Sequence, residues 1–137
     1  MSISDNVALA KRNIALAAER AGRRAEDIYL VGATKMNDAA RVREAIAAGL
    51  PICGENRVQE LVQKNAEHAY DGAALHFIGH LQKNKVRHVV GAASLIHSVD
   101  SLELMDCIGR TAEARGLTQD ILLEVNIGAE EAKSGFA

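Results

Sequence analysis

Short apolar runs alternate with longer amphipathic segments along almost the whole chain, and this alternation restricts its fold more than any other feature. We expect strands at 28–33, 51–54, 75–79, 95–99 and 121–127. Expected helices precede or separate them, at about 4–21, 39–48, 58–69, 83–90 and 100–115. Strands and helices that alternate at this spacing form right-handed βαβ units around a parallel sheet. The sequence therefore predicts an α/β fold.

Two architectures accommodate five such strands. One is an open, doubly wound sheet, and the other is the first part of a (β/α)8 TIM-type barrel, which as a whole takes ~250 residues. No proline-rich linker or low-complexity segment interrupts the pattern, so we expect residues 1–137 to form one domain. Periodicity alone leaves the choice between sheet and barrel open.

Polar residues and glycines punctuate the expected helices. Ser4 or Asp5 is expected to cap the first helix, and Asp100, with a glutamate three residues later, resembles the capping box of the last. In the helix at 58–69, helical spacing places Val58, Leu61, Val62 and Asn65 on one face. These signals fix the order of the elements and approximate ends for each.

Composition excludes several classes of partner. The net charge of −2 gives no reason to expect a nucleic acid or an anionic membrane surface. No apolar run approaches the roughly 20 residues that span a bilayer, and the N-terminus lacks a secretory signal pattern. Cys53 and Cys107 lie far apart with no CxxC motif, which indicates reduced thiols in a cytoplasmic protein, with a disulfide between them as the alternative.

Lys35 is the first candidate functional residue, because it directly follows a threonine and the apolar run Ile28–Ala33. An apolar run of this length is expected to form a fully buried parallel strand. The carboxyl ends of strands form the ligand-binding edge of parallel α/β folds. Partial desolvation there would lower the pKa of the lysine and favour the free amine, which attacks carbonyl groups. We therefore expect Lys35 to form a Schiff base with an aldehyde; the alternative is an ordinary solvated lysine.

Other polar residues give weaker signals. His76 and His80 are four residues apart, but they flank a strand end and no cysteine or carboxylate completes a metal site, so we expect none. His80 follows the third expected strand at the same edge as Lys35, and we expect it near a ligand bound there. Glu55 is expected to form a salt bridge or cap the following helix rather than act as a base. Lys83 and Lys85 are expected on a solvated helix face, with anion binding as the alternative.

Several stretches together resemble one known family. They are Lys35 after its strand, Cys53-Gly54-Glu55-Asn56-Arg57-Val58-Gln59-Glu60, His76-Phe77-Ile78-Gly79-His80-Leu81-Gln82-Lys83-Asn84-Lys85, His97-Ser98-Val99-Asp100, and Val125-Asn126-Ile127 through Lys133-Ser134-Gly135. The chain resembles the pyridoxal phosphate homeostasis proteins, single-domain relatives of the N-terminal barrel of alanine racemase, over nearly its whole length. The Gly-Glu-Asn and His-Phe-Ile-Gly-x-Leu-Gln-x-Asn-Lys stretches are the most specific.

The resemblance implies a barrel that binds pyridoxal 5′-phosphate (PLP) as an internal aldimine. The family's cofactor lysine corresponds to Lys35, and the asparagine of its Gly-Glu-Asn loop corresponds to Asn56. It implies cofactor binding and homeostasis without established turnover. A PLP-dependent racemase-like enzyme remains an alternative, but racemisation needs a second acid–base group across the cofactor, and neither Tyr29 nor Tyr70 is suitably placed.

The chain departs from the family in one respect, because it ends after the fifth expected strand. The family's phosphate-binding residues lie near the last strands, so none can be assigned here. Two open sheet edges predict self-association, since exposed edges pair with other chains. A cofactor-free structural half barrel is the third functional alternative.

Overall fold

The computed structural model describes all 137 residues as an α/β structure with one five-stranded sheet. The strands are β1 (Val31–Ala33), β2 (Ile52–Glu55), β3 (Ala74–Phe77), β4 (Leu95–Val99) and β5 (Asp120–Leu123). The helices are α1 (Ile3–Arg20), α2 (Ala39–Ala47), α3 (Val58–Ala66), α4 (Val86–Val89) and α5 (Leu102–Ala114), with 3₁₀ turns η1 (Ala25–Asp27) and η2 (Lys83–Lys85). None of the helices combines the length and apolar character needed to cross a bilayer.

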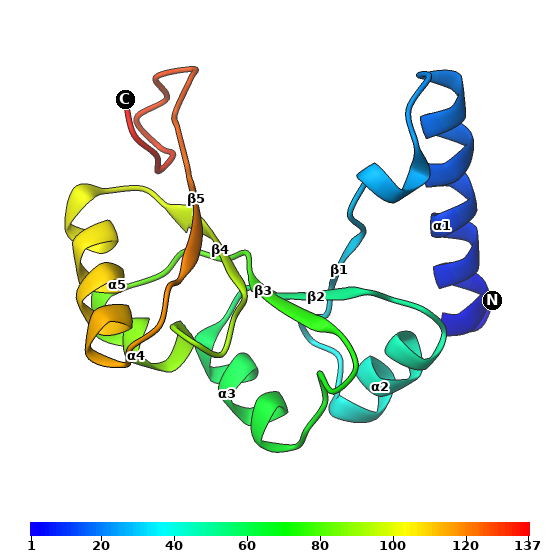
Figure 1. Ribbon diagram of the computed structural model, residues 1–137, viewed down its shortest axis with the longest axis horizontal. Coiled ribbons are helices and arrows are strands. Elements are labelled where there is room, and N and C mark those ends of the chain that lie inside the picture. Colours follow the sequence, from blue (N-terminus) through cyan, green and yellow to red (C-terminus); the bar gives the residue numbers. More distant parts are fainter.

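The order of the strands distinguishes between the two expected architectures. All neighbouring pairs are parallel, and the order across the sheet is β1-β2-β3-β4-β5. A doubly wound sheet reverses its order at a switch point, whereas a barrel places each strand beside the next in sequence. Right-handed crossovers in this order put helices on one side, and α2 to α5 follow one side of the sheet in Figure 1. The fold is therefore a partial TIM-barrel-like arrangement.

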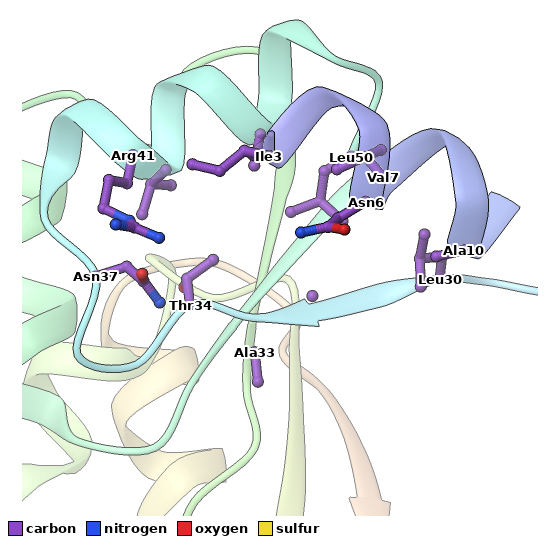
Figure 2. Close-up of a pocket in the computed structure, with 13 residues that line it drawn as sticks. Ile3, Asn6, Val7, Ala10, Leu30, Ala33, Thr34, Asn37, Arg41 and Leu50 are labelled. Carbon is purple, nitrogen blue, oxygen red and sulfur yellow. The ribbon is translucent and has the colours of Figure 1, made fainter. Parts of the chain in front are cut away.

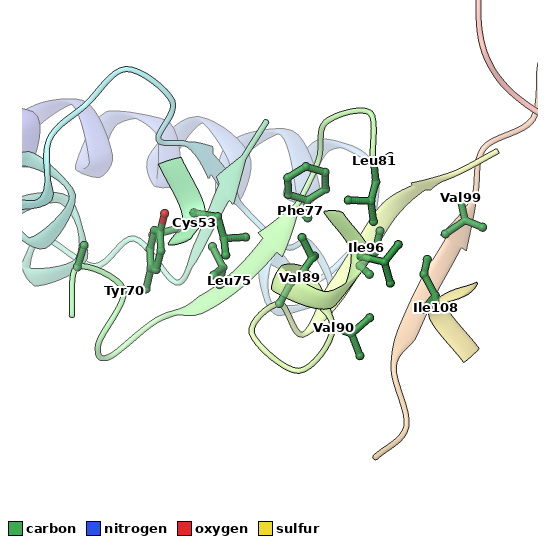
Figure 3. Packing of buried hydrophobic residues seen from close by; sticks show 14 of the residues in the cluster. Cys53, Tyr70, Leu75, Phe77, Leu81, Val89, Val90, Ile96, Val99 and Ile108 are labelled. Atoms are coloured by element: carbon green, nitrogen blue, oxygen red, sulfur yellow. The ribbon is translucent and has the colours of Figure 1, made fainter. Parts of the chain in front are cut away.

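The hydrophobic core lies between the sheet and these helices. Successive strand residues point to opposite faces, and Cys53, Leu75, Phe77 and Ile96 belong to the face that packs against the helices (Figure 3). The intervening residues, such as Gly54 and His76, belong to the opposite face. Every functional side chain on a strand is therefore assigned either to the helix-covered face or to the open one.

Two helices begin at residues other than those expected. Ser2 caps α1: its hydroxyl accepts from the amide of Asp5, and the Asp5 carboxylate accepts from the amide of Ser2. Asp5 is therefore the third residue of a capping box rather than the cap. Ser101, not Asp100, caps α5 by accepting from the amide of Leu104. In both helices, a serine close to the expected residue satisfies the free amides of the first turn.

The first strand is shorter and more exposed than its apolar sequence suggests. Only Val31–Ala33 is paired, none of the three is fully buried, and Tyr29 is 79% exposed. The expectation of a fully buried strand is wrong because β1 is an edge strand, with β2 as its only neighbour. Lys35 consequently follows a strand at the edge of the sheet and not a central strand.

Helix α3 also ends earlier than expected, at Ala66. His68, two residues further along the chain, adopts a left-handed φ of 58°.

Candidate functional site

The three predicted site residues follow three neighbouring strands. Lys35 is two residues beyond β1, Asn56 directly follows β2, and His80 is three residues beyond β3. Because the strands are parallel, all three positions lie along the carboxyl edge of the sheet. Adjacent strands are ~4.8 Å apart, so Lys35 and Asn56 come from neighbouring strands and His80 comes from the next one. No hydrogen bond or ion pair joins the three side chains to one another.

Lys35 lies in a turn between β1 and α2. Its carbonyl accepts a hydrogen bond from the Asn37 side-chain amide at 3.0 Å. The lysine is exposed, which contradicts the expected partial desolvation. The reason is its place at the edge of the sheet, where no strand covers β1 on its outer side. The amine is therefore accessible to a small molecule approaching this edge.

Asn56 is held by close packing between two loops. Its side-chain oxygen Oδ1 is buried and accepts no hydrogen bond within the protein. A Cβ built on Gly79 would lie only 2.6 Å from the Asn56 Cα, so only glycine fits at position 79 without movement of backbone atoms. An unpaired buried acceptor is costly unless a ligand or water donates to it. Asn56 is therefore suited to accept a hydrogen bond from a ligand at this edge.

His80 directly follows Gly79, which packs against Asn56, but its side chain contacts neither Lys35 nor Asn56 by a hydrogen bond or ion pair. Its side chain is 64% exposed, and Nδ1 is 3.6 Å from a carboxylate oxygen of Asp100. This contact joins the ends of β3 and β4, beside the start of α5. Its role in ligand binding stays a prediction.

Glu55 occupies the centre of a buried polar network on the helix-covered face. Its Oε2 accepts hydrogen bonds from the Thr34 hydroxyl at 2.7 Å, the Tyr70 hydroxyl at 2.7 Å and the Lys64 ammonium at 2.9 Å. Glu55 is fully buried, and the Lys64 side chain is 8% exposed. The expected salt bridge of Glu55 is confirmed. Its position on the helix-covered face means that Glu55 faces α3 and not the open face of the sheet.

Sequence reasoning missed the partners of Glu55 in α3. Lys64 also donates to the carbonyl of Thr34 at 2.7 Å and to Glu60 at 3.1 Å, and Glu60 accepts from the Met36 amide at 3.0 Å. The hydrogen bond from Met36 is the main reason that the pKa of Glu60 is lowered, and Lys64 adds to this effect. The network therefore reaches the residues on both sides of Lys35. One signal in the sequence was the four-residue spacing of Glu60 and Lys64, typical of an ion pair on a helix.

Glu55 also affects the pKa values of two other buried side chains, Tyr70 and Cys53. Burial, and then the hydrogen bond to Glu55, raise the pKa of the Tyr70 hydroxyl far above its usual range. Burial, with the charge of Glu55 adding to it, raises the pKa of the Cys53 thiol to about 11. Both groups therefore stay protonated at neutral pH. Neither cysteine forms a disulfide.

His76 and His97 form a pair on neighbouring strands. His97 Nε2 lies 2.9 Å from His76 Nδ1, and the ring centroids are 5.0 Å apart. Desolvation lowers both pKa values, and the proximity of His97 lowers that of His76 further. No group of three or more histidine, cysteine, aspartate or glutamate side chains is arranged to hold a metal ion.

An apolar cavity lies under α1 and reaches the carboxyl edge of the sheet only at Thr34 and Asn37. Its volume is about 280 Å³, and it separates α1 from β1 and α2 (Figure 2). Leu30, Val42 and Leu50 form part of its wall, and Asn6 and Arg41 supply polar groups. It includes none of Lys35, Asn56 and His80, so it is a gap under α1 rather than part of the candidate site.

Known proteins are similar to this chain in both sequence and fold. No family model matches the chain. It is 40% identical over 135 residues to the pyridoxal phosphate homeostasis protein of Aquifex aeolicus, an alignment that covers 98% of this chain and 59% of the relative. The chain is homologous to the pyridoxal phosphate homeostasis proteins. It spans about three-fifths of the length of the curated relatives it matches most fully.

Solved structures of other proteins match the fold. A crystal structure of an unknown protein from Bifidobacterium adolescentis superposes with a TM-score of 0.84 at 40% identity, over 98% of this chain and 59% of its own. PipY of Synechococcus elongatus, in a structure with PLP bound, superposes with a TM-score of 0.71 at 37% identity, over 80% of this chain and 51% of its own. Both likenesses agree with the partial barrel seen here.

Proposed function

We propose that this chain is part of a cytoplasmic PLP-binding barrel domain that stores the cofactor reversibly. The observation that carries the proposal is the place of Lys35, an accessible amine at the carboxyl end of β1. The homology to proteins named for PLP homeostasis supports it, as does the likeness to PipY with PLP bound. The two free cysteines agree with a reducing compartment.

Three of the residues present fit the cofactor. The Lys35 amine is free of any hydrogen bond or ion pair within the protein and is exposed, so a carbonyl group can reach it. Asn56 presents a buried oxygen that lacks a donor, and His80 supplies a further polar group along the edge. When bound, PLP supplies an electrophilic aldehyde carbon and a pyridine ring with hydrogen-bonding groups. The proposed roles are covalent attachment for Lys35 and ring orientation for Asn56 and His80.

Binding is favoured over catalysis by the position of the tyrosines. Racemisation requires acid and base groups on opposite sides of the reacting carbon. The Tyr70 hydroxyl is buried and donates to Glu55, and Tyr29 is exposed before β1. Among these 137 residues neither is available as the partner of Lys35. Storage without turnover is accordingly the proposed activity.

The test is to trap the cofactor on the protein. We expect that incubation with PLP, followed by borohydride reduction and peptide mass spectrometry, gives one predominant adduct, on Lys35. The physical reason is that only Lys35 combines an accessible amine with the neighbouring Asn56. Labelling scattered over Lys83, Lys85 and other surface lysines would instead indicate a structural half barrel without a formed site.

We also propose that the chain self-associates through its sheet edges. Strands β1 and β5 each have one paired side only, and Leu122, Leu123 and Val125 at the β5 end are about half exposed. Unpaired strand edges and exposed apolar side chains both favour association. We expect sedimentation equilibrium to give a mass that rises with concentration in the micromolar range. A constant monomer mass over that range would contradict the proposal.

A further inference from the structure

We infer that Glu60 and Lys64 of α3 are positioning residues for Lys35, because they hold the backbone on both sides of it. The inference rests on the proposed function, in which the Lys35 amine binds the cofactor. Neither side chain is on the same element as Lys35. Their contacts nevertheless reach the residue before it and the residue after it in sequence.

On the amino-terminal side, the contact is made by Lys64. Its ammonium donates to the carbonyl oxygen of Thr34 at 2.7 Å, and this carbonyl belongs to the peptide bond that joins Thr34 to Lys35. The Thr34 hydroxyl donates to Glu55 at 2.7 Å, and Glu55 in turn accepts from Lys64 at 2.9 Å. Two charged groups therefore fix the last residue before the lysine.

On the carboxyl-terminal side, the contact is made by Glu60. Its carboxylate accepts from the Met36 amide at 3.0 Å. Met36 has φ 62°, a left-handed conformation that is unfavourable for a residue with a Cβ and persists only where its surroundings impose it. Glu60 accepts from Lys64 at 3.1 Å as well, so one helix binds both ends of the turn. The turn is thereby kept in a single shape.

This arrangement also explains a costly feature of the protein. A buried ion pair contributes little net stability, because removing two charges from water offsets their attraction. Glu55 and Lys64 are both buried, yet their hydrogen bonds extend to Thr34 and, through Glu60, to Met36. These hydrogen bonds orient the backbone that carries Lys35. Such orientation favours reaction of the lysine, because small misplacements of reacting groups strongly reduce rates.

The test compares three variants of the cofactor-free and PLP-treated protein. Glu60→Ala removes the acceptor for Met36, Glu60→Gln keeps an acceptor oxygen, and Glu67→Ala makes the same charge change at the other end of α3. We expect Glu60→Ala to slow borohydride-trapped PLP labelling of Lys35 about tenfold. We expect the Met36 amide to exchange with solvent at least about tenfold faster. Glu60→Gln should restore most of the Lys35 labelling rate and most of the protection of the Met36 amide. Glu67→Ala should change neither quantity.

The two readouts separate the inference from the proposed function. If the unaltered chain is labelled on Lys35 and Glu60→Ala is labelled equally fast, the inference is wrong and the proposed function stands. If the unaltered chain is not labelled on Lys35, the proposed function fails, and the positioning role fails with it even where Met36 exchange changes. A third outcome would also overturn the inference. If Glu60→Ala slows Lys35 labelling and also lowers the urea concentration at half unfolding, and Glu60→Gln restores neither, Glu60 has a general structural role and not a positioning role.

Discussion

Replacing Lys35 with alanine is expected to remove the borohydride-trapped PLP adduct while leaving the fold intact. The adduct requires a primary amine at the bound aldehyde, and alanine has none. Lys35 is exposed, and its side chain makes no hydrogen bond or ion pair within the protein. The free energy of unfolding should therefore change by no more than about 0.5 kcal/mol, as for other exposed positions. Mass spectrometry after reduction and urea denaturation measure the two effects.

Lys85→Ala is the matched control for Lys35→Ala. Lys85 lies in η2 and is also exposed, and its replacement by alanine removes the same charge. We expect this variant to retain the full adduct, so any loss specific to Lys35→Ala reflects position and not net charge. If Lys35→Ala keeps the full adduct, another lysine holds the cofactor and the assignment of Lys35 is wrong.

The order and type of the elements could be predicted from the sequence, because they follow from apolar periodicity. All five strands and their connecting helices occur in the expected order, and β4 has the expected bounds, Leu95–Val99, whereas β5 ends at Leu123 and not at residue 127. The order of the strands across the sheet could not be predicted from periodicity, because the apolar pattern of a strand does not depend on which strands it pairs with. The extent of β1 was overestimated for a related reason. Its length depends on pairing, and β1 has a single neighbour.

The positions of the candidate site residues could be predicted from the sequence, but the buried network of Glu55 and Lys64 beside them could not. Lys35, Asn56 and His80 lie at the carboxyl edge because residues that follow parallel strands must lie there. The buried Lys64 was missed, because lysines on amphipathic helices are normally solvated. Its spacing from Leu61 continues the apolar face, yet the pattern had placed Val62 and Asn65 there, and both are exposed. Burial of Lys64 depends on Glu55, which belongs to a different element, so local spacing could not reveal it.

Replacing Glu55 alone is expected to cause the largest loss of stability. In Glu55→Leu, the Lys64 ammonium remains with 8% of its side chain exposed and loses its buried partner. The hydroxyls of Thr34 and Tyr70 lose their acceptor as well. Removing one partner of a buried ion pair costs about 3–5 kcal/mol, a large part of the roughly 5–15 kcal/mol that stabilises a domain. Urea denaturation with linear extrapolation measures the loss.

The double variant Glu55→Leu with Lys64→Met separates the charge from the packing. It removes both ions together, so no uncompensated charge stays buried, and we expect most of the lost stability to return. Tyr70→Phe, which deletes one hydrogen bond to the carboxylate, should cost about 1.5–3 kcal/mol and remains measurable if Glu55→Leu does not fold. Equal destabilisation of the single and double variants would show that the ion pair is not the source of the loss. Recovery of stability in the double variant, with Lys35 labelling still slow, would show that stability and the orientation of Lys35 depend on different properties of the same network.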